Sequence, residues 1–253
     1  MKNVILLLTK SSSQVIINQY NKLKTELNPE KYDIFILYHD KINNIPNIIK
    51  NENYFSFNNN ILQELNFKPI GKFLLPGSNH FPLFKFKKIH SEYKYYWVIE
   101  DDVRFNGNWN TFFSKFEYFN CDFLSSDIRN YIDDSSWCYF NSLSHPIKKI
   151  EDKNKIASFN PIYRISNNSI DYLSDMFLDG WSGHHEVSIS TLLNYGGFHI
   201  ADFGGNGKYT PDEFKNKNYN INDSKTHIYR PIFTDLGNIT DVIYHPVKNF
   251  KNN

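Results

Sequence analysis

The 253-residue chain has few cysteines and no long apolar run. Its two cysteines, Cys121 and Cys138, cannot form a metal cluster by themselves, and they indicate no disulfide framework. No stretch approaches the roughly 18 apolar residues that a membrane-spanning helix needs. The N-terminal apolar run, residues 4–8, is shorter than the apolar region of a signal peptide, and no small-residue cleavage site follows it. We therefore expect a soluble cytoplasmic protein without a transmembrane segment, and peripheral association with a membrane stays open.

A surplus of one charge sign is also missing, because 28 basic residues nearly cancel 27 acidic ones. Without such a surplus, no overall field attracts nucleic acid, so we expect no nucleic-acid partner. Aromatic residues, in contrast, are abundant at 17%, with 17 Tyr, 22 Phe and 4 Trp. Sugars often bind by stacking on aromatic faces, but a core rich in Phe and Tyr explains the same composition. Aromatic content alone therefore does not decide the function.

Short apolar runs alternate with longer amphipathic stretches along the chain, and these patterns predict strands and helices respectively. Strands that alternate with helices indicate an α/β fold with a mainly parallel central sheet flanked by helices. No internal repeat or clear linker is present, so we expect a single domain over residues 1–253. We expect an irregular loop with short helical turns at 41–60 and a surface excursion or lid at 130–155. The predicted strands are 4–8, 32–38, 72–75, 95–99, 121–125, 161–165 and 198–202, and the predicted helices are 13–27, 80–90, 109–119, 169–178 and 186–195.

Three consecutive acids, Glu100, Asp101 and Asp102, directly follow the apolar run 95–99. Like charges at the end of a buried strand repel each other, and leaving them unpaired is costly. In open α/β sheets, ligands bind beyond the carboxyl ends of the strands. A divalent cation would neutralise the acids, and carboxylate oxygens suit Mg²⁺ or Mn²⁺, which share their other positions with phosphates and water. The segment therefore predicts a metal–diphosphate site, with a solvated acidic turn as the alternative.

The stretch VIEDD, residues 98–102, resembles the DXD motif of GT-A glycosyltransferases in its Glu-Asp-Asp variant. The likeness covers about residues 1–205 in the order of elements, although only 100–102 match at the level of a motif. It implies a GT-A-like fold, a nucleotide-diphosphate sugar as donor, expected to be a UDP-sugar, and a Mn²⁺ or Mg²⁺ ion. By this resemblance Asp102 binds the metal, while Asp101 and Glu100 hold the ribose or water on the metal. It also implies a nucleotide-binding half at about 1–105 and an acceptor-binding half with the tail at about 106–253.

The stretch GWSGHHE, residues 180–186, places Glu186 at the start of a predicted helix. A general base must reach the acceptor hydroxyl in its ionised form, and a helix N-terminus favours a charged carboxylate. GT-A inverting enzymes place an acid at a comparable point, so the resemblance implies that Glu186 is the base and that the reaction inverts. The alternative is that Glu186 only stabilises its helix. Trp181 is expected to stack on an acceptor sugar, and His185 and Asp202 to line the acceptor side.

The tail contains DVIYHPVK, residues 241–248. Many GT-A enzymes use a C-terminal His as an additional metal ligand, so the resemblance implies this role for His245. A lone His is more often structural, and that alternative stays open. Lys248 would offset diphosphate charge as a point charge.

Polar residues also follow the first two predicted strands, where GT-A enzymes hold the base and ribose. By the resemblance these residues bind nucleotide, although ordinary strand-end polarity would explain them too. The residues concerned are Thr9, Lys10 and Ser11 after the first strand, and Asp40 after the second. Asn79 and His80 open the helix before the acidic motif, and they either cap this helix or contact nucleotide.

These predictions together describe a metal-dependent, hexosyltransferase-like enzyme that moves a sugar from a nucleotide-diphosphate donor to a hydroxyl of a glycan. Two other classes remain open. A metal-dependent phosphoesterase would also gather acids at strand ends, although it would normally need more ligands close in sequence. A noncatalytic module that binds nucleotide or sugar would share the site but transfer nothing.

Overall fold

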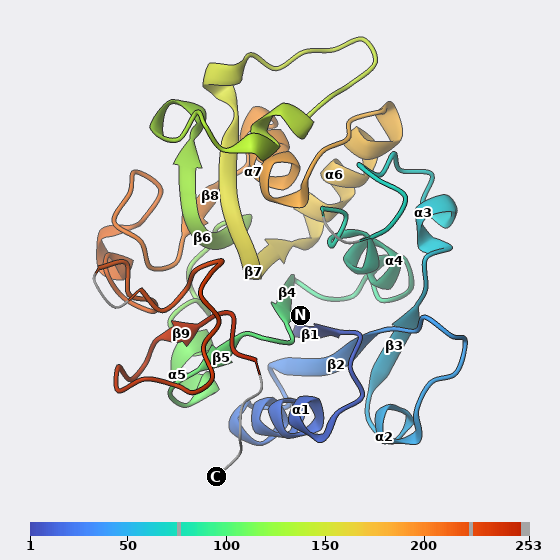
Figure 1. Cartoon of the computed structure of the whole chain (residues 1–253), viewed down its shortest axis with the longest axis vertical. Helices are drawn as coiled ribbons and strands as arrows, with labels where there is room; N and C mark the ends of the chain where they lie inside the picture. The colour runs from blue at the N-terminus through green and yellow to red at the C-terminus, as the bar shows by residue number, and fades with distance from the viewer. Residues whose placement is uncertain (75–76, 223–224, 249–253) are drawn as a thin grey trace.

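The computed structural model describes residues 1–74, 77–222 and 225–248. Within them, seven strands form one central sheet in the order β3-β2-β1-β4-β7-β6-β8 (Figure 1). Four of its six neighbouring strand pairs are parallel, and β7 pairs antiparallel with both β4 and β6. The bounds are β1 Asn3–Thr9, β2 Tyr32–His39, β3 Tyr54–Phe57, β4 Tyr95–Glu100, β6 Phe123–Asn130, β7 Ile156–Ser166 and β8 Ile200–Asp202. A second, two-stranded sheet joins β5 (Arg104–Phe105) to β9 (Ile243–Tyr244).

Helices cover both faces of the central sheet, and the alternation of side chains along the strands explains why. On β1, Leu6 packs into one apolar cluster and Leu7 into the other. The Leu7 side holds α1 (Gln14–Glu26) and α5 (Trp109–Ser114). The Leu6 side holds α4 (Phe81–Ile89), α6 (Asn167–Asp179) and α7 (His185–Tyr195). The predicted α/β fold with a mainly parallel sheet flanked by helices is therefore confirmed.

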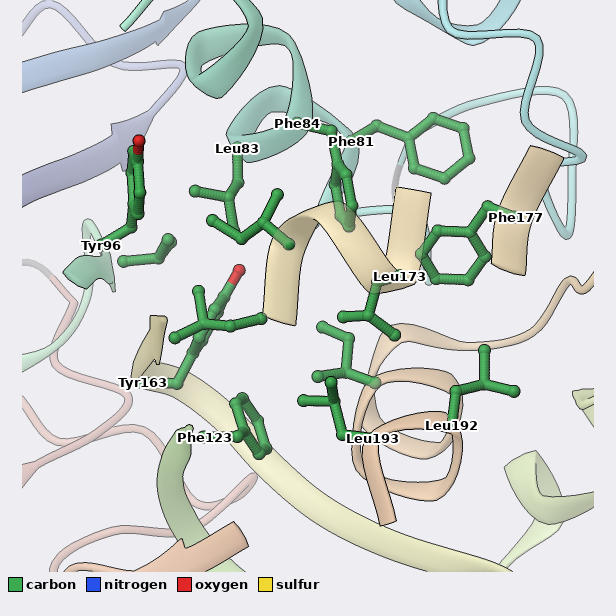
Figure 2. Packing of buried hydrophobic residues seen from close by; sticks show 14 of the residues in the cluster. Phe81, Leu83, Phe84, Tyr96, Phe123, Tyr163, Leu173, Phe177, Leu192 and Leu193 are labelled. Carbon is green, nitrogen blue, oxygen red and sulfur yellow. The ribbon is translucent and has the colours of Figure 1, made fainter. Parts of the chain in front are cut away.

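Figure 2 shows how the second of these faces is filled. Phe81 and Phe84 of α4 lie beside Phe177 of α6. The ring of Phe67 is 5.3–5.5 Å from each of these three rings, and Phe84 meets Phe177 edge to face at 5.5 Å. Leu192 and Leu193 of α7 point into the same layer. Most of the aromatic residues counted in the sequence therefore serve the core. None of the described helices is long and apolar enough to cross a membrane.

Several elements differ from the sequence-based predictions. The segment 41–60 was expected to be a loop with short helical turns. It does contain a single-turn helix, α2 (Asn47–Lys50), but also the edge strand β3, and a second single-turn helix, α3 (Ile61–Glu64), follows it. Residues 72–74 form no strand, and Leu75 lies outside the described residues. Strands β6 and β7 are longer than predicted because they extend their antiparallel pairing to Asn130 and Ile156. Helix α5 ends at Ser114 rather than at residue 119.

The predicted surface excursion 130–155 contains three short 3-10 helices: η1 (Tyr131–Asp133), η2 (Cys138–Ser142) and η3 (Asp152–Asn154). It is packed against the protein rather than free of it, since Phe140, Leu143 and Ile150 are buried in the core. A fourth 3-10 helix, η4 (Asp212–Phe214), lies in the tail.

Candidate active site

The three acids leave the sheet at the carboxyl end of β4, beside the end of β1. The register pairs Leu8 of β1 with Glu100, so Thr9 lies next to the acids. Thr9 Oγ1 donates a hydrogen bond of 2.5 Å to Asp101 Oδ2, and Asn79 Nδ2 donates one of 3.0 Å to Glu100 Oε1. Arg104 Nη1 donates to the Asp101 carbonyl at 2.7 Å. Asp101 and Glu100 are thus each held by a neighbouring side chain, and Asp102 is left to face the tail.

The tail reaches Asp102 through a short piece of β structure. Strands β5 and β9 pair antiparallel, and the backbone N–H of Val247 donates to the Asp102 carbonyl at 2.7 Å. This places His245 Nε2 3.4 Å from Asp102 Oδ1 and Lys248 Nζ 3.3 Å from Asp102 Oδ2. Ligand atoms of Glu100, Asp102 and His245 all lie within 4.8 Å of one another. The predicted metal ligands Asp102 and His245 therefore come together, and Glu100 joins them.

The hydrogen bond of His245 to the backbone determines whether its other ring nitrogen, Nε2, is a donor or an acceptor. His245 Nδ1 lies 2.8 Å from the Ile228 carbonyl, which can only accept, so Nδ1 carries the proton. In the neutral ring, Nε2 then points a lone pair at Asp102 Oδ1, a buried oxygen that has no hydrogen-bond donor among the described residues. Two acceptors face each other across 3.4 Å. A cation between them, either a metal or a second proton on His245, would satisfy both.

The three acids differ in their readiness to ionise. Burial raises the pKa of Glu100 to about 7, and the charge of Asp102 adds to this rise while His245 opposes it. Burial also raises the pKa of Asp101, against the hydrogen bond from Thr9. Burial alone would raise the pKa of Asp102 too, but the positive charges of a doubly protonated His245 and of Lys248 together hold it below its ordinary value. Asp102 is therefore the carboxylate that is most firmly charged at neutral pH.

The acids form one wall of an open cleft with a volume of about 730 Å³, including the part open to solvent. The part of this cleft that water-sized molecules can occupy is about 220 Å³, somewhat below the range of about 300–1,000 Å³ that is usual for small-molecule sites. The predicted nucleotide-binding residues Thr9, Lys10, Glu100, Asp101 and Lys248 all line it. So do His39 and Phe57, whose rings stack at 5.0 Å, and sequence reasoning did not find either of them.

Two other predicted nucleotide-binding residues are not among the residues that line this cleft. Asp40 Oδ1 accepts the backbone N–H groups of Ile42 and Asn44, so it organises its own turn, beside a second hollow that includes Lys85. Ser11 Oγ accepts the N–H of Ser13 just before α1. Both therefore have local structural partners that account for their polarity.

Glu186 lies at the N-terminus of α7, as predicted. His184 caps this helix by accepting the Glu186 N–H at 3.3 Å, and its Nδ1 lies 3.6 Å from Glu186 Oε2. The N–H of Asn160 donates to Glu186 Oε1 at 3.3 Å. Burial raises the pKa of Glu186 to about 7, although its side chain keeps 14% exposure. Its charge adds slightly to the rise in the pKa of Glu100, although Glu186 is not among the residues that line the cleft.

The three predicted acceptor-binding residues have positions that disagree with that role. Trp181 is 2% exposed, and its ring packs in the core 5.1 Å from the ring of His145, so it offers no free face to a sugar. His185 is buried with its ring 4.7 Å from that of His184. Asp202 is buried, and its oxygens accept the N–H groups of Ile128, Gly204 and Gly205 and the Tyr219 hydroxyl. Its hydrogen-bonding capacity is used within the fold.

No protein-family model matches the chain, and no curated protein matches its sequence. Solved structures do resemble it. Galactosyltransferase LgtC, in complex with donor and acceptor sugar analogs, is 10% identical over 81% of this chain and 73% of that chain, with a TM-score of 0.44. Mouse xyloside xylosyltransferase 1 is 7% identical over 77% of this chain and 81% of that chain, with a TM-score of 0.37. A protein described as a glucose-1-phosphate thymidylyltransferase of Bacillus anthracis is 13% identical over 70% of this chain and 75% of that chain, with a TM-score of 0.38. At such low identities and TM-scores, these similarities assign no activity to this chain, and its function has to be argued from its own site.

Proposed function

We propose that this protein is a metal-dependent glycosyltransferase that moves a sugar from a nucleotide-diphosphate donor, a UDP-sugar by preference, to a hydroxyl of a glycan acceptor. The proposal includes a GT-A-like fold and an inverting reaction. The observation that carries it is the pair of acceptors His245 Nε2 and Asp102 Oδ1, which face each other at the edge of a cleft lined by Asp102, Lys10 and Lys248.

The residues present fit a divalent cation. Glu100 and Asp102 offer hard oxygen ligands and His245 offers one nitrogen, with all three atoms within 4.8 Å of one another. A mixed set of this kind suits Mn²⁺, and Mg²⁺ is the alternative if the ion draws most of its ligands from phosphate and water. When bound, such an ion supplies positive charge that stabilises a departing diphosphate.

Two lysines would also stabilise the departing diphosphate, in addition to the metal ion. Lys10 and Lys248 both line the cleft, and Lys248 contacts Asp102 at 3.3 Å while its side chain remains 49% exposed. A flexible ammonium group in this position can leave the carboxylate for a phosphate oxygen. Its charge would stabilise the negative charge that develops on the leaving group.

Glu186 is the base in this proposal. The acceptor oxygen forms a bond to the anomeric carbon of the donor sugar, and the bond from that carbon to the diphosphate oxygen breaks. The electron pair of the broken bond leaves with the diphosphate, and the acceptor hydroxyl proton passes to the Glu186 carboxylate. Because its pKa is raised to about 7, Glu186 is available as a base mainly above neutral pH, and the proton it gains is held well.

A panel of nucleotide sugars with and without Mn²⁺, read by thermal shift and by slow donor hydrolysis, tests this function. The proposal expects one or more donors to raise the melting temperature only when Mn²⁺ is present. Hydrolysis of simple phosphoesters without any nucleotide sugar would favour a phosphoesterase instead. Nucleotide binding without turnover of any donor, even to water, would favour a noncatalytic module.

A further inference from the structure

A strap formed by η2 and its flanking residues, 137–144, lies across the N-terminus of α7 next to Glu186. Ser144 and Ser182 exchange backbone hydrogen bonds of 2.8 and 2.9 Å. The N–H of His184 donates to Ser142 Oγ at 2.9 Å. These contacts hold residues 137–144 against the residues that position Glu186, although the bonded residues are 38 and 42 positions apart in sequence.

The strap carries two aromatic rings at this place. Tyr139 stacks on the His184 ring at 4.0 Å with an interplanar angle of 20°, and His184 in turn contacts Glu186. Trp137 lies 5.3 Å from Tyr139 at 73°, so the two rings form an angled surface. Both keep intermediate exposure, whereas Trp97, Trp109 and Trp181 are only 1–2% exposed. Trp137 is the one tryptophan that solvent reaches.

Charged groups border this aromatic surface. The guanidinium of Arg129 lies over the Trp137 ring, 5.2 Å from its centroid. Asp127 Oδ2 and Asp134 Oδ2 hold the guanidinium at 2.7 and 3.0 Å, and the Asp127 side chain is 60% exposed. A sugar presents C–H bonds on one face of its ring and hydroxyl groups around its edge. Aromatic faces suit the first, and carboxylate acceptors with guanidinium donors suit the second.

We propose that Trp137 and Tyr139 bind the acceptor sugar, with its ring packed on their exposed surface and its hydroxyl groups at Asp127 and Arg129. The inference rests on the proposed glycosyl transfer for the statement that the sugar is an acceptor. It gives Glu186 a bound hydroxyl to deprotonate, because the strap positions the sugar beside α7. It also replaces Trp181, which is buried, as the aromatic contact of the acceptor.

The exposed Trp137 allows a direct binding experiment with the intact protein. Acrylamide quenches solvent-exposed tryptophan, so quenching in this protein reports mainly on Trp137. The probes are methyl pyranosides of common hexoses, N-acetylhexosamines and pentoses, added in excess. The proposal expects at least one of them to reduce quenching. Tyr139→Ala keeps Trp137 as the reporter but removes one of the two aromatic rings. We expect it to weaken the binding of that glycoside by about 5- to 10-fold.

The matched control is Tyr195→Ala, which removes an exposed tyrosine at the other end of α7 and should retain the affinity of the unchanged protein. A glycoside panel that never protects Trp137, or equal affinity in Tyr139→Ala, would overturn the proposal. Nucleotide binding with Mn²⁺ is measured on the same variants. If nucleotide binding is normal and Tyr139→Ala does not alter glycoside affinity, the proposed acceptor site is wrong and the transferase proposal stands. If the unchanged protein binds no nucleotide while a glycoside protects Trp137 from quenching, the aromatic surface is a sugar-binding site and the transferase proposal is wrong.

Discussion

His245 Nε2 lies 3.4 Å from Asp102 Oδ1, although more than half of the chain separates the two residues in sequence. The contact depends on the pairing of β5 with β9 and on the hydrogen bond from Val247 to the Asp102 carbonyl. Neither side chain has a stabilising partner in the contact unless a cation lies between them or His245 takes up a second proton. This contact between Asp102 and His245 connects the acidic end of β4 to the tail.

His245→Ala should weaken Mn²⁺ binding, but less than the loss of Asp102 does, because a neutral imidazole contributes one ligand and no charge. Removing a single ligand of this kind should reduce affinity on the order of 10- to 100-fold. Electron paramagnetic resonance of free Mn²⁺ gives the affinity. Limited proteolysis of the tail shows whether β9 stays in place, and His199→Ala at the protein surface serves as the control. Equal Mn²⁺ affinity in His245→Ala with an intact tail would make His245 structural.

Glu186→Gln keeps the size of the side chain and removes the base. Transfer should fall on the order of 10²-fold or more, the usual scale of general base catalysis. Donor affinity should be retained, because the metal and diphosphate contacts come from Glu100, Asp102 and the tail. The measurement is kcat beside donor affinity. A folded variant with near-normal kcat would remove Glu186 as the base and would reopen a retaining mechanism.

We also expect Glu186→Gln to change the stability of the folded protein in a pH-dependent way. The pKa of Glu186 is raised to about 7 in the folded protein, from about 4.3 in the unfolded chain. The folded state therefore binds this proton more tightly, and ionising Glu186 costs stability as pH rises from about 4.3 through 7. Glu186→Gln should stabilise the protein by roughly 1–3 kcal/mol at pH 8 and have little effect at pH 4, before Glu186 ionises.

Urea unfolding at the two pH values measures this difference. Asp171→Asn, an exposed acid on α6, controls for general charge effects. If the stability difference between Glu186→Gln and the unchanged protein is the same at both pH values, burial does not raise the pKa of Glu186.

The sequence predicted the fold well where a single segment carries the signal. The apolar runs at 4–8, 32–38 and 95–99 became β1, β2 and β4, and the acids after residue 99 lie at the expected edge of the sheet. Strand β3 was missed because it is an edge strand of only four residues, YFSF, which follows a long Asn-rich stretch. Strands β5 and β9 have only two residues each, too few for any periodicity, yet they are what brings His245 to Asp102.

The sequence was a poorer guide to the acceptor side of the site. Trp181 was expected to stack on an acceptor sugar, but the chain after α6 directs it into the core. Trp137 lies in a polar stretch that looked like a surface loop. The contacts that place it beside Glu186 are long-range backbone and hydroxyl hydrogen bonds, which local sequence does not encode.

Asp102→Asn tests the central claim, that the acidic end of β4 binds a metal for a nucleotide diphosphate. The low pKa of Asp102 means that its charge already stabilises the folded protein above the unfolded pKa and that this contribution is lost as pH falls. The variant should thus be slightly less stable without metal at pH 7, by about 1 kcal/mol or less, because Lys248 is partly exposed to solvent.

The decisive measurement is calorimetric titration of the unchanged protein and of Asp102→Asn with UDP, each with and without Mn²⁺. The account predicts that Mn²⁺ strengthens UDP binding to the unchanged protein by at least 10-fold and has no effect on the folded Asp102→Asn variant. Equal, Mn²⁺-dependent UDP affinity in both proteins would contradict it.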